Sequence, residues 1–129
     1  MKLTMSASIH ARWGHRVDEL IHTHAWKVGA TVSGPVDCDK VFPADDLERL
    51  VTEVIEPWCG HYLTREDVGE WKGFVPLVWD REPTVEEITR RVWRELEQRI
   101  ERSTVVLESV SLEEASEFDR CRTVTLSRA

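Results

Sequence analysis

Alternation between apolar and polar residues near the start of the chain constrains the fold more than any other feature of the sequence. From Lys2 to Ala11 every second residue is apolar, and the alternation returns from about His22 to Ser33, where Gly34-Pro35 ends it. A period of two is typical of a strand with one buried face. The sequence therefore predicts two half-buried strands in succession.

Two amphipathic helices are predicted in the middle of the chain. From about Pro43 to Trp58 apolar residues recur at spacings of three and four, as on one face of a helix. The second helix begins at the capping-box pattern Thr84-Val85-Glu86-Glu87 and is expected to end near Arg102. The segment Arg65 to Glu82 between them is expected to be a long functional or mobile loop.

Two further strands are predicted at Ser103 to Ser111 and Phe118 to Ser127, with Leu112 to Glu117 as an acidic linker. The order strand, strand, helix, helix, strand, strand indicates an α+β fold, and 129 residues suit one domain over 1–129. Such a sheet leaves both edges open, which favours a homo-oligomer.

Composition excludes several classes of partner. The 24 acidic residues outnumber the 17 basic ones, and the basic residues are scattered, so nucleic acid is not expected to bind. Neither a membrane-spanning run nor a signal-peptide pattern is present, so we expect a cytoplasmic protein that does not enter a membrane. The three cysteines form no CxxC pair and are expected to be free thiols.

Histidines gather at the end of the first predicted strand and the start of the second. His22 and His24 are two residues apart, so both side chains leave the same face of a strand, and His10 ends the preceding strand. Three nitrogen ligands leave one coordination position open, as in a catalytic zinc site. The alternative is that these histidines, with His15, are ordinary polar residues near a turn.

Five segments in order carry a family resemblance. These segments are SASIH, IHTHAWKV, VIEPWCGHYLT, EPTVEEITRRVWREL and VVLES. Together they resemble the 6-pyruvoyl-tetrahydropterin synthase and 6-carboxy-tetrahydropterin synthase family over nearly the whole chain. SASIH is similar to the strand that closes on the first zinc histidine, and IHTHAWKV to the His-Gly-His strand start, with Thr23 in place of the glycine.

The resemblance implies a tunnelling fold, in which trimeric β-barrels stack as hexamers with active sites at subunit interfaces. It implies Zn²⁺ bound by His10, His22 and His24. It also implies that Glu108 anchors the pterin, its carboxylate accepting two parallel hydrogen bonds from the ring. The alternative for Glu108 is a solvent-facing charge on a strand. Thr84 and Glu86, in the segment that resembles a Pro-Thr-x-Glu helix start, are expected to contact substrate.

The chain departs from the family at the residues that move protons. The family has a cysteine four residues before its His-Gly-His and an Asp-His pair further on. Here Asp18 takes the cysteine position, Cys59 and Gly60 fall on the pair, and His61 lies one residue late. A family variant instead has a glutamate three residues before the first histidine, and Glu19 matches that spacing.

Such variants cleave the pterin side chain and leave a 6-hydroxymethyl group. A carboxylate takes a proton from a side-chain hydroxyl while zinc polarises the adjacent oxygen, as retro-aldol cleavage requires. Glu19 is therefore the predicted general base, with Asp18 beside it and His61 assisting. The alternative is that Asp18 and Glu19 form a solvated acidic turn.

The predicted function is a zinc-dependent lyase or aldolase that acts on dihydroneopterin or its triphosphate. The missing Cys-Asp-His set and a loop with two tryptophans, Trp71 and Trp79, favour a second reading. In that reading the protein is a zinc-dependent cyclase or lyase for a non-pterin metabolite of a specialised pathway. A third reading is a catalytically inactive scaffold that keeps the fold.

Overall fold

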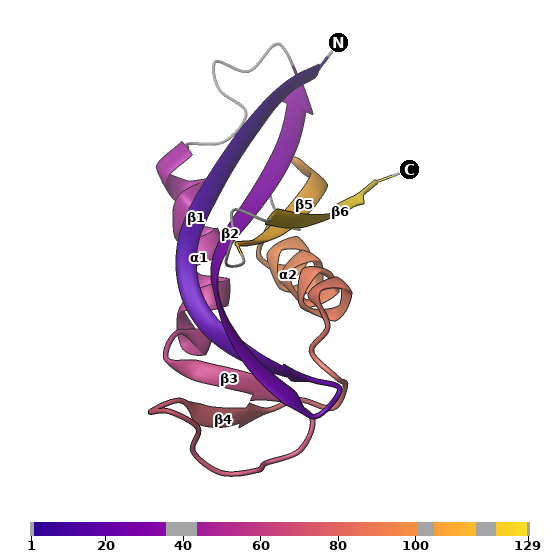
Figure 1. The fold of residues 1–129 in the computed structure, drawn as a ribbon. Coiled ribbons are helices and arrows are strands. Elements are labelled where there is room, and N and C mark those ends of the chain that lie inside the picture. Colours follow the sequence, from indigo (N-terminus) through magenta and orange to yellow (C-terminus); the bar gives the residue numbers. More distant parts are fainter. Residues whose placement is uncertain (1, 36–43, 101–104, 116–120, 129) are drawn as a thin grey trace.

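The structure is a mixed six-stranded sheet with two helices packed against one face (Figure 1). This computed structural model describes residues 2–35, 44–100, 105–115 and 121–128. The strand order is β4-β3-β1-β2-β5-β6. The α+β class predicted from the sequence is confirmed. The elements are β1 (Lys2–Val17), β2 (Leu20–Pro35), α1 (Ala44–Ile55), the 3₁₀ turn η1 (Glu56–Trp58), β3 (His61–Thr64), β4 (Val75–Val78), α2 (Val85–Ile100), β5 (Val106–Ala115) and β6 (Cys121–Ser127).

Strands β1 and β2 form one long antiparallel hairpin that curves along its length (Figure 1). Pairing runs without interruption from Lys2 opposite Pro35 to Val17 opposite Leu20. The turn consists of Asp18 and Glu19, whose φ angles of 52° and 67° are left-handed. Two successive left-handed residues are typical of the tightest hairpin turns. The prediction ended the first strand at Ala11, whereas pairing continues to the turn.

Strand β5 is longer than predicted at its C-terminal end. Leu112 and Glu114 were assigned to an acidic linker, but both are paired with β2 and point into the core, where they are 0% and 7% exposed. Two adjacent glutamates suggested a linker, yet only Glu113 lies on the outer face. A bulge in the pairing with β2 places Glu108 as the extra residue between Leu107 and Ser109.

Two short strands were not predicted. Strand β3 lies parallel to β1, which it meets at Gly14 and His15, and β4 lies parallel to β3. Each has four residues, too few for an alternating pattern to show in the sequence. β4 lies within the predicted loop Arg65 to Glu82, so part of that segment extends the sheet.

The core lies between the inner face of the sheet and the two helices. Helix α1 packs mainly on β1, and α2 packs on β5 and β6. The apolar positions predicted for each helix are buried, which confirms both periodicities. The Thr84 hydroxyl accepts a hydrogen bond from the Glu87 amide at 3.1 Å, as the capping box predicts. These buried helix residues are Leu47, Leu50, Val51, Val54, Ile55, Ile88, Val92, Leu96 and Ile100.

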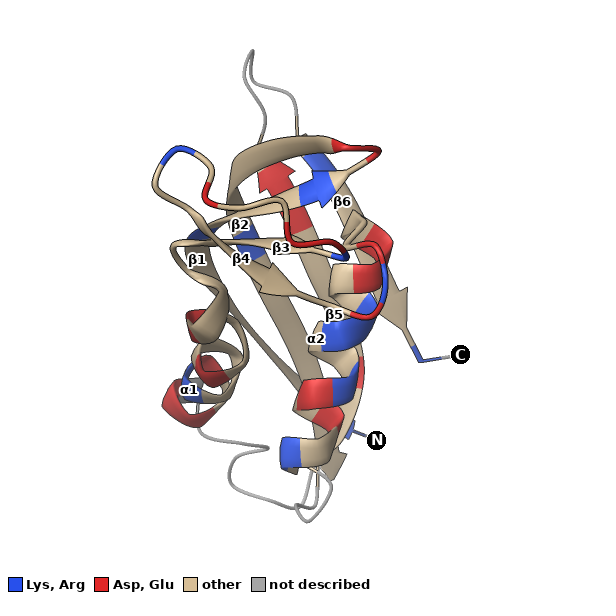
Figure 2. Ribbon diagram, turned by 90° about the horizontal axis from the view of Figure 1, so that it is seen from below, with Lys and Arg blue, Asp and Glu red and all other residues tan. Residues whose placement is uncertain are grey.

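Much of one long strand edge has no neighbour among the described residues. β3 covers β1 only at Gly14 and His15, so the rest of that edge, from Lys2 to Trp13, meets no other described strand. β6 is the edge at the other side. Lysine and arginine lie interspersed with acidic residues over the molecule (Figure 2). None of the helices in the described ranges is long and apolar enough to cross a membrane.

Candidate metal centre and adjoining pocket

Three histidines share the inner face of the hairpin near its turn. His15 of β1 lies directly opposite His22 of β2, and His24 lies opposite Trp13, one pair further from the turn. Directly opposed residues point to the same face, and so do residues two apart on one strand. His15, His22 and His24 therefore project from the same side of the sheet.

His10 does not join this group. It lies opposite Lys27, five positions before His15 on the same strand. An odd spacing puts its side chain on the outer face of the sheet, where it is exposed. The structure therefore does not bring the predicted set His10, His22 and His24 together. The structure keeps His22 and His24 together and places His15 beside them.

The three imidazoles are close but unequally buried. The ring centroids are 5.2 Å apart for His15 and His24, 6.0 Å for His22 and His24, and 6.4 Å for His15 and His22. His15 is 5% exposed and His24 is half-buried, whereas His22 is exposed. His22 therefore lies at the rim of the cluster and the other two lie within it.

A carboxylate from β5 completes the buried part of the cluster. Glu114 lies opposite Trp26 on the inner face, and its Oε2 is 3.6 Å from Nε2 of His24. One potential ligand atom from each of His15, His24 and Glu114 lies within 4.8 Å of the others. Two nitrogens and an oxygen at such spacing are a donor set that fits a divalent metal such as zinc.

Backbone groups hold both buried rings. Nδ1 of His15 lies 2.8 Å from the carbonyl oxygen of Pro83, which only accepts, so Nδ1 carries the hydrogen and Nε2 keeps its lone pair. The backbone of Ala115 hydrogen-bonds His24. Metal-binding imidazoles are commonly oriented by such a bond to the nitrogen that does not bind the metal.

Burial keeps these imidazoles neutral. It lowers the pKa of His15, although the hydrogen bond to Pro83 partly opposes the shift. Burial also lowers the pKa of His24, and here the charge of Glu114 opposes it. The neutral ring is the form that binds a metal, so both histidines are prepared as ligands at neutral pH.

Four tryptophans line the wall behind the histidines. Trp13 and Trp26 stack with centroids 4.9 Å apart and ring planes 9° from parallel, and Nε1 of Trp26 donates to the carbonyl oxygen of Trp13 at 3.0 Å. Trp58 meets Trp13 edge-on, and Trp79 meets Trp58 in the same way. All four rings are buried, and the Trp26 centroid is 5.2 Å from that of His15 and 5.1 Å from that of His24, so this tryptophan wall makes the inner side of the cluster apolar.

The segment before α2 fixes the tip of the hairpin. The Glu82 carboxylate accepts a hydrogen bond from the Asp18 amide at 2.8 Å, next to the Pro83 carbonyl that holds His15. The side chains of Asp18 and Glu19 are exposed in the turn. Glu19 lies three residues before His22, so the predicted general base lies in the turn beside the rim of the cluster.

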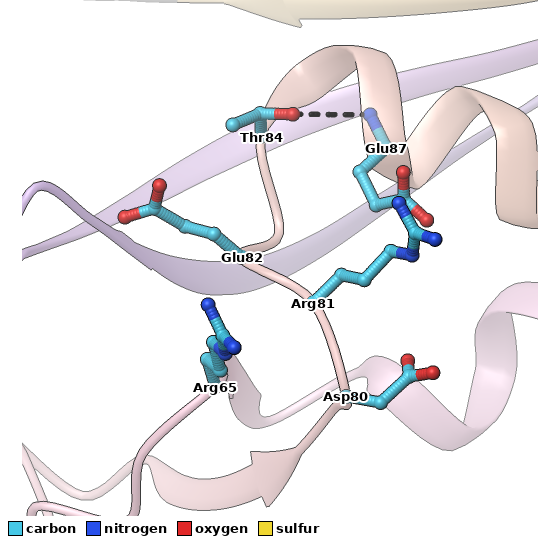
Figure 3. A pocket seen from close by; sticks show the side chains of 6 residues that line it. All are labelled: Arg65, Asp80, Arg81, Glu82, Thr84 and Glu87. Carbon is cyan, nitrogen blue, oxygen red and sulfur yellow. Dashed lines mark hydrogen bonds between the residues drawn. The ribbon is translucent and has the colours of Figure 1, made fainter.

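A pocket of about 550 Å³ adjoins this segment (Figure 3). Thr84, a predicted substrate contact, lines it, whereas Glu86 is exposed on the first turn of α2. Arg81 points toward Glu87, and Glu82 lies on the other side of the chain (Figure 3). Because Pro83 holds His15, the pocket lies next to the histidine cluster. Its lining residues are Arg65, Asp80, Arg81, Glu82, Thr84 and Glu87.

Two other predicted site residues lie apart from the cluster. His61 begins β3, and its Nδ1 lies 3.3 Å from the carbonyl oxygen of Val75. Glu108 accepts hydrogen bonds from the Ser33 hydroxyl at 2.6 Å and from Lys2 at 3.1 Å, and these bonds, that of Ser33 first, lower its pKa. Ser33 is nine residues beyond His24 on β2, about 30 Å along a strand.

Sequence reasoning missed His15 and Glu114. A signal for His15 was present, because the alternation puts His22 and His24 in register with the apolar Trp26, whereas His10 falls with Ser6 and Ser8. Continuing the first strand to a tight turn would have selected His15. Glu114 had no such signal, because its approach to His24 depends on pairing between strands distant in sequence.

Comparisons with known proteins agree with the fold. The sequence model of the family described as 6-pyruvoyl tetrahydropterin synthase matches residues 3–124. A Caenorhabditis elegans 6-pyruvoyl tetrahydropterin synthase structure is 17% identical with a TM-score of 0.70, covering 100% of this chain and 97% of that one. The Plasmodium falciparum enzyme is 14% identical with a TM-score of 0.66, covering 98% and 99%.

A third similar structure is a Plasmodium vivax 6-pyruvoyltetrahydropterin synthase in which a catalytic glutamate is replaced by cysteine. It is 12% identical with a TM-score of 0.61, and the match covers 99% of each chain. No match was found among curated proteins. At these identities the structural likeness concerns the fold.

Proposed function

Because the chain belongs to the 6-pyruvoyl tetrahydropterin synthase family, we propose that it is a zinc-dependent lyase or aldolase that acts on the side chain of a dihydropterin. Dihydroneopterin and its triphosphate are the candidate substrates. The observation that carries the proposal is the cluster of His15, His22 and His24 beside a pocket, in which His15 is buried and His24 is half-buried.

The cluster is the proposed zinc site. His15 and His24 offer neutral rings held by backbone groups, and His22 lies on the same face at the rim. Zinc bound there would supply a Lewis acid for a substrate oxygen. The protein's part is to orient the ligands and, with the tryptophan wall, to exclude water from one side.

Glu19 is the proposed general base. It is exposed in the turn three residues before His22, so it can reach a substrate that sits over the rim. A carboxylate there would take the proton from the hydroxyl on the second side-chain carbon. As the bond between the first two side-chain carbons breaks, the second carbon and its oxygen become the carbonyl group of the released aldehyde. The conjugated ring takes up the electron pair, and a proton returns to the first carbon to leave a 6-hydroxymethyl group.

The catalytic glutamate of the Plasmodium vivax protein supports a carboxylate in this role, because it shows that a protein of this fold uses one. Asp18 is the weaker candidate. Its amide is fixed by Glu82, so its backbone serves to position the turn.

A second copy of the chain is the proposed source of the pterin anchor. Glu108 of β5 is hydrogen-bonded to Ser33, which lies nine residues, or about 30 Å, along β2 from His24, too far to hold a ring whose side chain reaches the same chain's histidines. The open edge of β1 and the edge strand β6 offer surfaces through which copies can pair. We therefore propose a homo-oligomer, a hexamer built from trimers, in which Glu108 of one copy serves the histidines of another.

One observation favours a second candidate substrate class. The pocket next to His15 is lined by the cations Arg65 and Arg81 and by three acids, Asp80, Glu82 and Glu87. A flat bicyclic ring is usually held by a more apolar pocket with few polar groups. A polar, non-pterin metabolite that is cleaved or cyclised at the same metal would suit this lining.

Turnover of the two pterins tests the proposal directly. Zinc-loaded oligomer is incubated separately with dihydroneopterin and with its triphosphate, and 6-hydroxymethyl-dihydropterin and the released aldehyde are measured by mass spectrometry. Glu19→Gln should lower the rate by about 100-fold or more, as expected for a general base. Glu48→Gln, an exposed change on α1, should leave it unchanged. If zinc-loaded wild-type protein leaves both pterins intact, the pterin assignment fails.

A further inference from the structure

We propose that Glu114 is a direct metal ligand, so that the ion is held by His15, His24 and Glu114, with His22 at the exposed rim. This inference rests on the metal site of the proposed function and changes the set of residues that bind the metal there. It replaces a set of three imidazoles by two imidazoles and one carboxylate.

The spacing of the atoms is the first support. Zinc bonds of about 2.1 Å at tetrahedral angles place neighbouring ligand atoms about 3.4 Å apart. The distance from Nε2 of His24 to Oε2 of Glu114 is 3.6 Å, and one donor atom of His15 lies within 4.8 Å of both residues' donors. Small side-chain movements would therefore complete three bonds to one ion.

Burial of the carboxylate is the second support. Glu114 is 7% exposed, and a buried carboxylate requires a compensating positive charge. The side chains closest to it in the cluster are the imidazoles of His15 and His24, and neither carries a permanent positive charge. Nε of Arg122 is 4.0 Å away, but that side chain is 84% exposed and directed mainly to solvent. A metal cation held by the three donors would supply the compensating positive charge.

The support around the ligands is the third observation. The Pro83 carbonyl accepts a hydrogen bond from the His15 ring, and the backbone of Ala115 is hydrogen-bonded to the His24 ring. Ala115 follows Glu114 directly, so the end of β5 provides both a carboxylate and an orienting group. Ligands held in this way are preorganised for one ion.

The position of His22 agrees with a lesser role in binding. His22 is exposed, and its ring centroid is 6.0 Å or more from those of His15 and His24. Its donors are not part of the group that meets the 4.8 Å spacing. An ion held by His15, His24 and Glu114 would keep a coordination position free for a substrate oxygen.

Metal affinity in matched variants tests the proposal. Glu114→Gln keeps the shape of the side chain and removes its charge, and Glu113→Gln makes the same change on the outer face of the same strand. Zinc affinity is measured by competition with a chelator, and the visible spectrum of the Co²⁺-substituted oligomer reports the ligand set. Glu114→Gln should weaken zinc binding by about 100-fold or more and change the Co²⁺ spectrum, because loss of an outer-shell partner alone typically costs 10- to 100-fold.

Glu113→Gln should alter neither quantity, and His22→Ala should weaken binding less than His24→Ala. Zinc X-ray absorption of the wild-type oligomer, which needs no variant to fold, should show two imidazoles. Three imidazoles, or a Glu114→Gln protein with wild-type affinity and spectrum, would overturn the proposal. None of these measurements uses a pterin, so they remain valid if the pterin assignment fails. If the protein turns over a pterin while its zinc is bound by three imidazoles, only the assignment of Glu114 is rejected.

Discussion

His15 and His22 lie directly opposite each other across the β1–β2 hairpin, whereas His10, five positions before His15, lies on the other face of the sheet. Their pairing follows from the turn at Asp18 and Glu19, because a tight turn fixes which residues are opposed. The hairpin turn thus determines which histidines can share an ion.

Substitution of single histidines should show whether His15 or His10 is the metal ligand from β1. His15→Ala should abolish stoichiometric zinc in the purified protein, because it removes a buried ring whose Nε2 faces the cluster. His10→Ala should retain the metal, because that side chain lies on the outer face. Metal content by mass spectrometry decides between them. Loss of zinc in the His10 variant with retention in the His15 variant would contradict the arrangement.

The helices could be predicted from sequence because their information is local. Residues such as Leu47 and Leu96 recur at helical spacing, and a helix forms its hydrogen bonds within its own segment. Strands β3 and β4 could not be predicted in this way, because four-residue strands depend on pairing partners elsewhere. The same limit applies to the site: His22 and His24 are neighbours in sequence, whereas Glu114 reaches them only through the pairing of β2 with β5.

Mixing two inactive variants should restore activity if the site is shared between copies. Glu108→Gln lacks the proposed pterin anchor and His24→Ala lacks a metal ligand, so each alone should lose at least about 100-fold in turnover. After unfolding and refolding together in equal amounts, about a quarter of the interfaces would combine an intact His24 with an intact Glu108. Recovery near a quarter of wild-type turnover is expected. Failure to recover, with mixed oligomers demonstrated by mass spectrometry, would place both residues in one chain's site.

The pKa of Glu108 should rise when Ser33 is replaced. The Ser33 hydroxyl is the first cause of its lowered pKa and Lys2 the second, so Ser33→Ala should bring the carboxyl closer to its ordinary value of 4.5. Titration of the labelled carboxyl carbon by nuclear magnetic resonance measures the change, with Lys2→Met as a second variant. An unchanged pKa in both would show that these hydrogen bonds do not form in solution.

The same shift has a consequence for stability against pH. A folded-state pKa below the unfolded value means that the unfolded chain binds more protons in the interval between them, so stability increases with pH there. The contribution of Glu108 is present above pH 4.5 and is lost as the pH falls through the folded-state value. The difference in melting temperature between wild type and Lys2→Met should therefore narrow below pH 4.5.

Glu19→Gly should separate stability from catalysis. Glu19 has a φ of 67°, which costs a residue with a Cβ about 1–2 kcal/mol and glycine almost nothing. Glycine is also more flexible in the unfolded chain, and this offsets part of the gain. The free energy of unfolding should therefore rise by up to about 1 kcal/mol. Turnover should fall as in Glu19→Gln if the carboxylate moves the proton. Chemical denaturation and pterin turnover are the two measurements, and an active, stabilised Glu19→Gly would exclude Glu19 as the base.

Trp26, which stacks on Trp13, gives this protein an intrinsic fluorescence that can report on metal binding. The Trp26 ring centroid lies 5.2 Å from that of His15 and 5.1 Å from that of His24, so an ion bound by these imidazoles would lie close to an indole. A paramagnetic ion at that distance quenches indole emission. Loading of the centre with Co²⁺ would thus be followed in the unmodified chain by its own fluorescence, without a dye or a label.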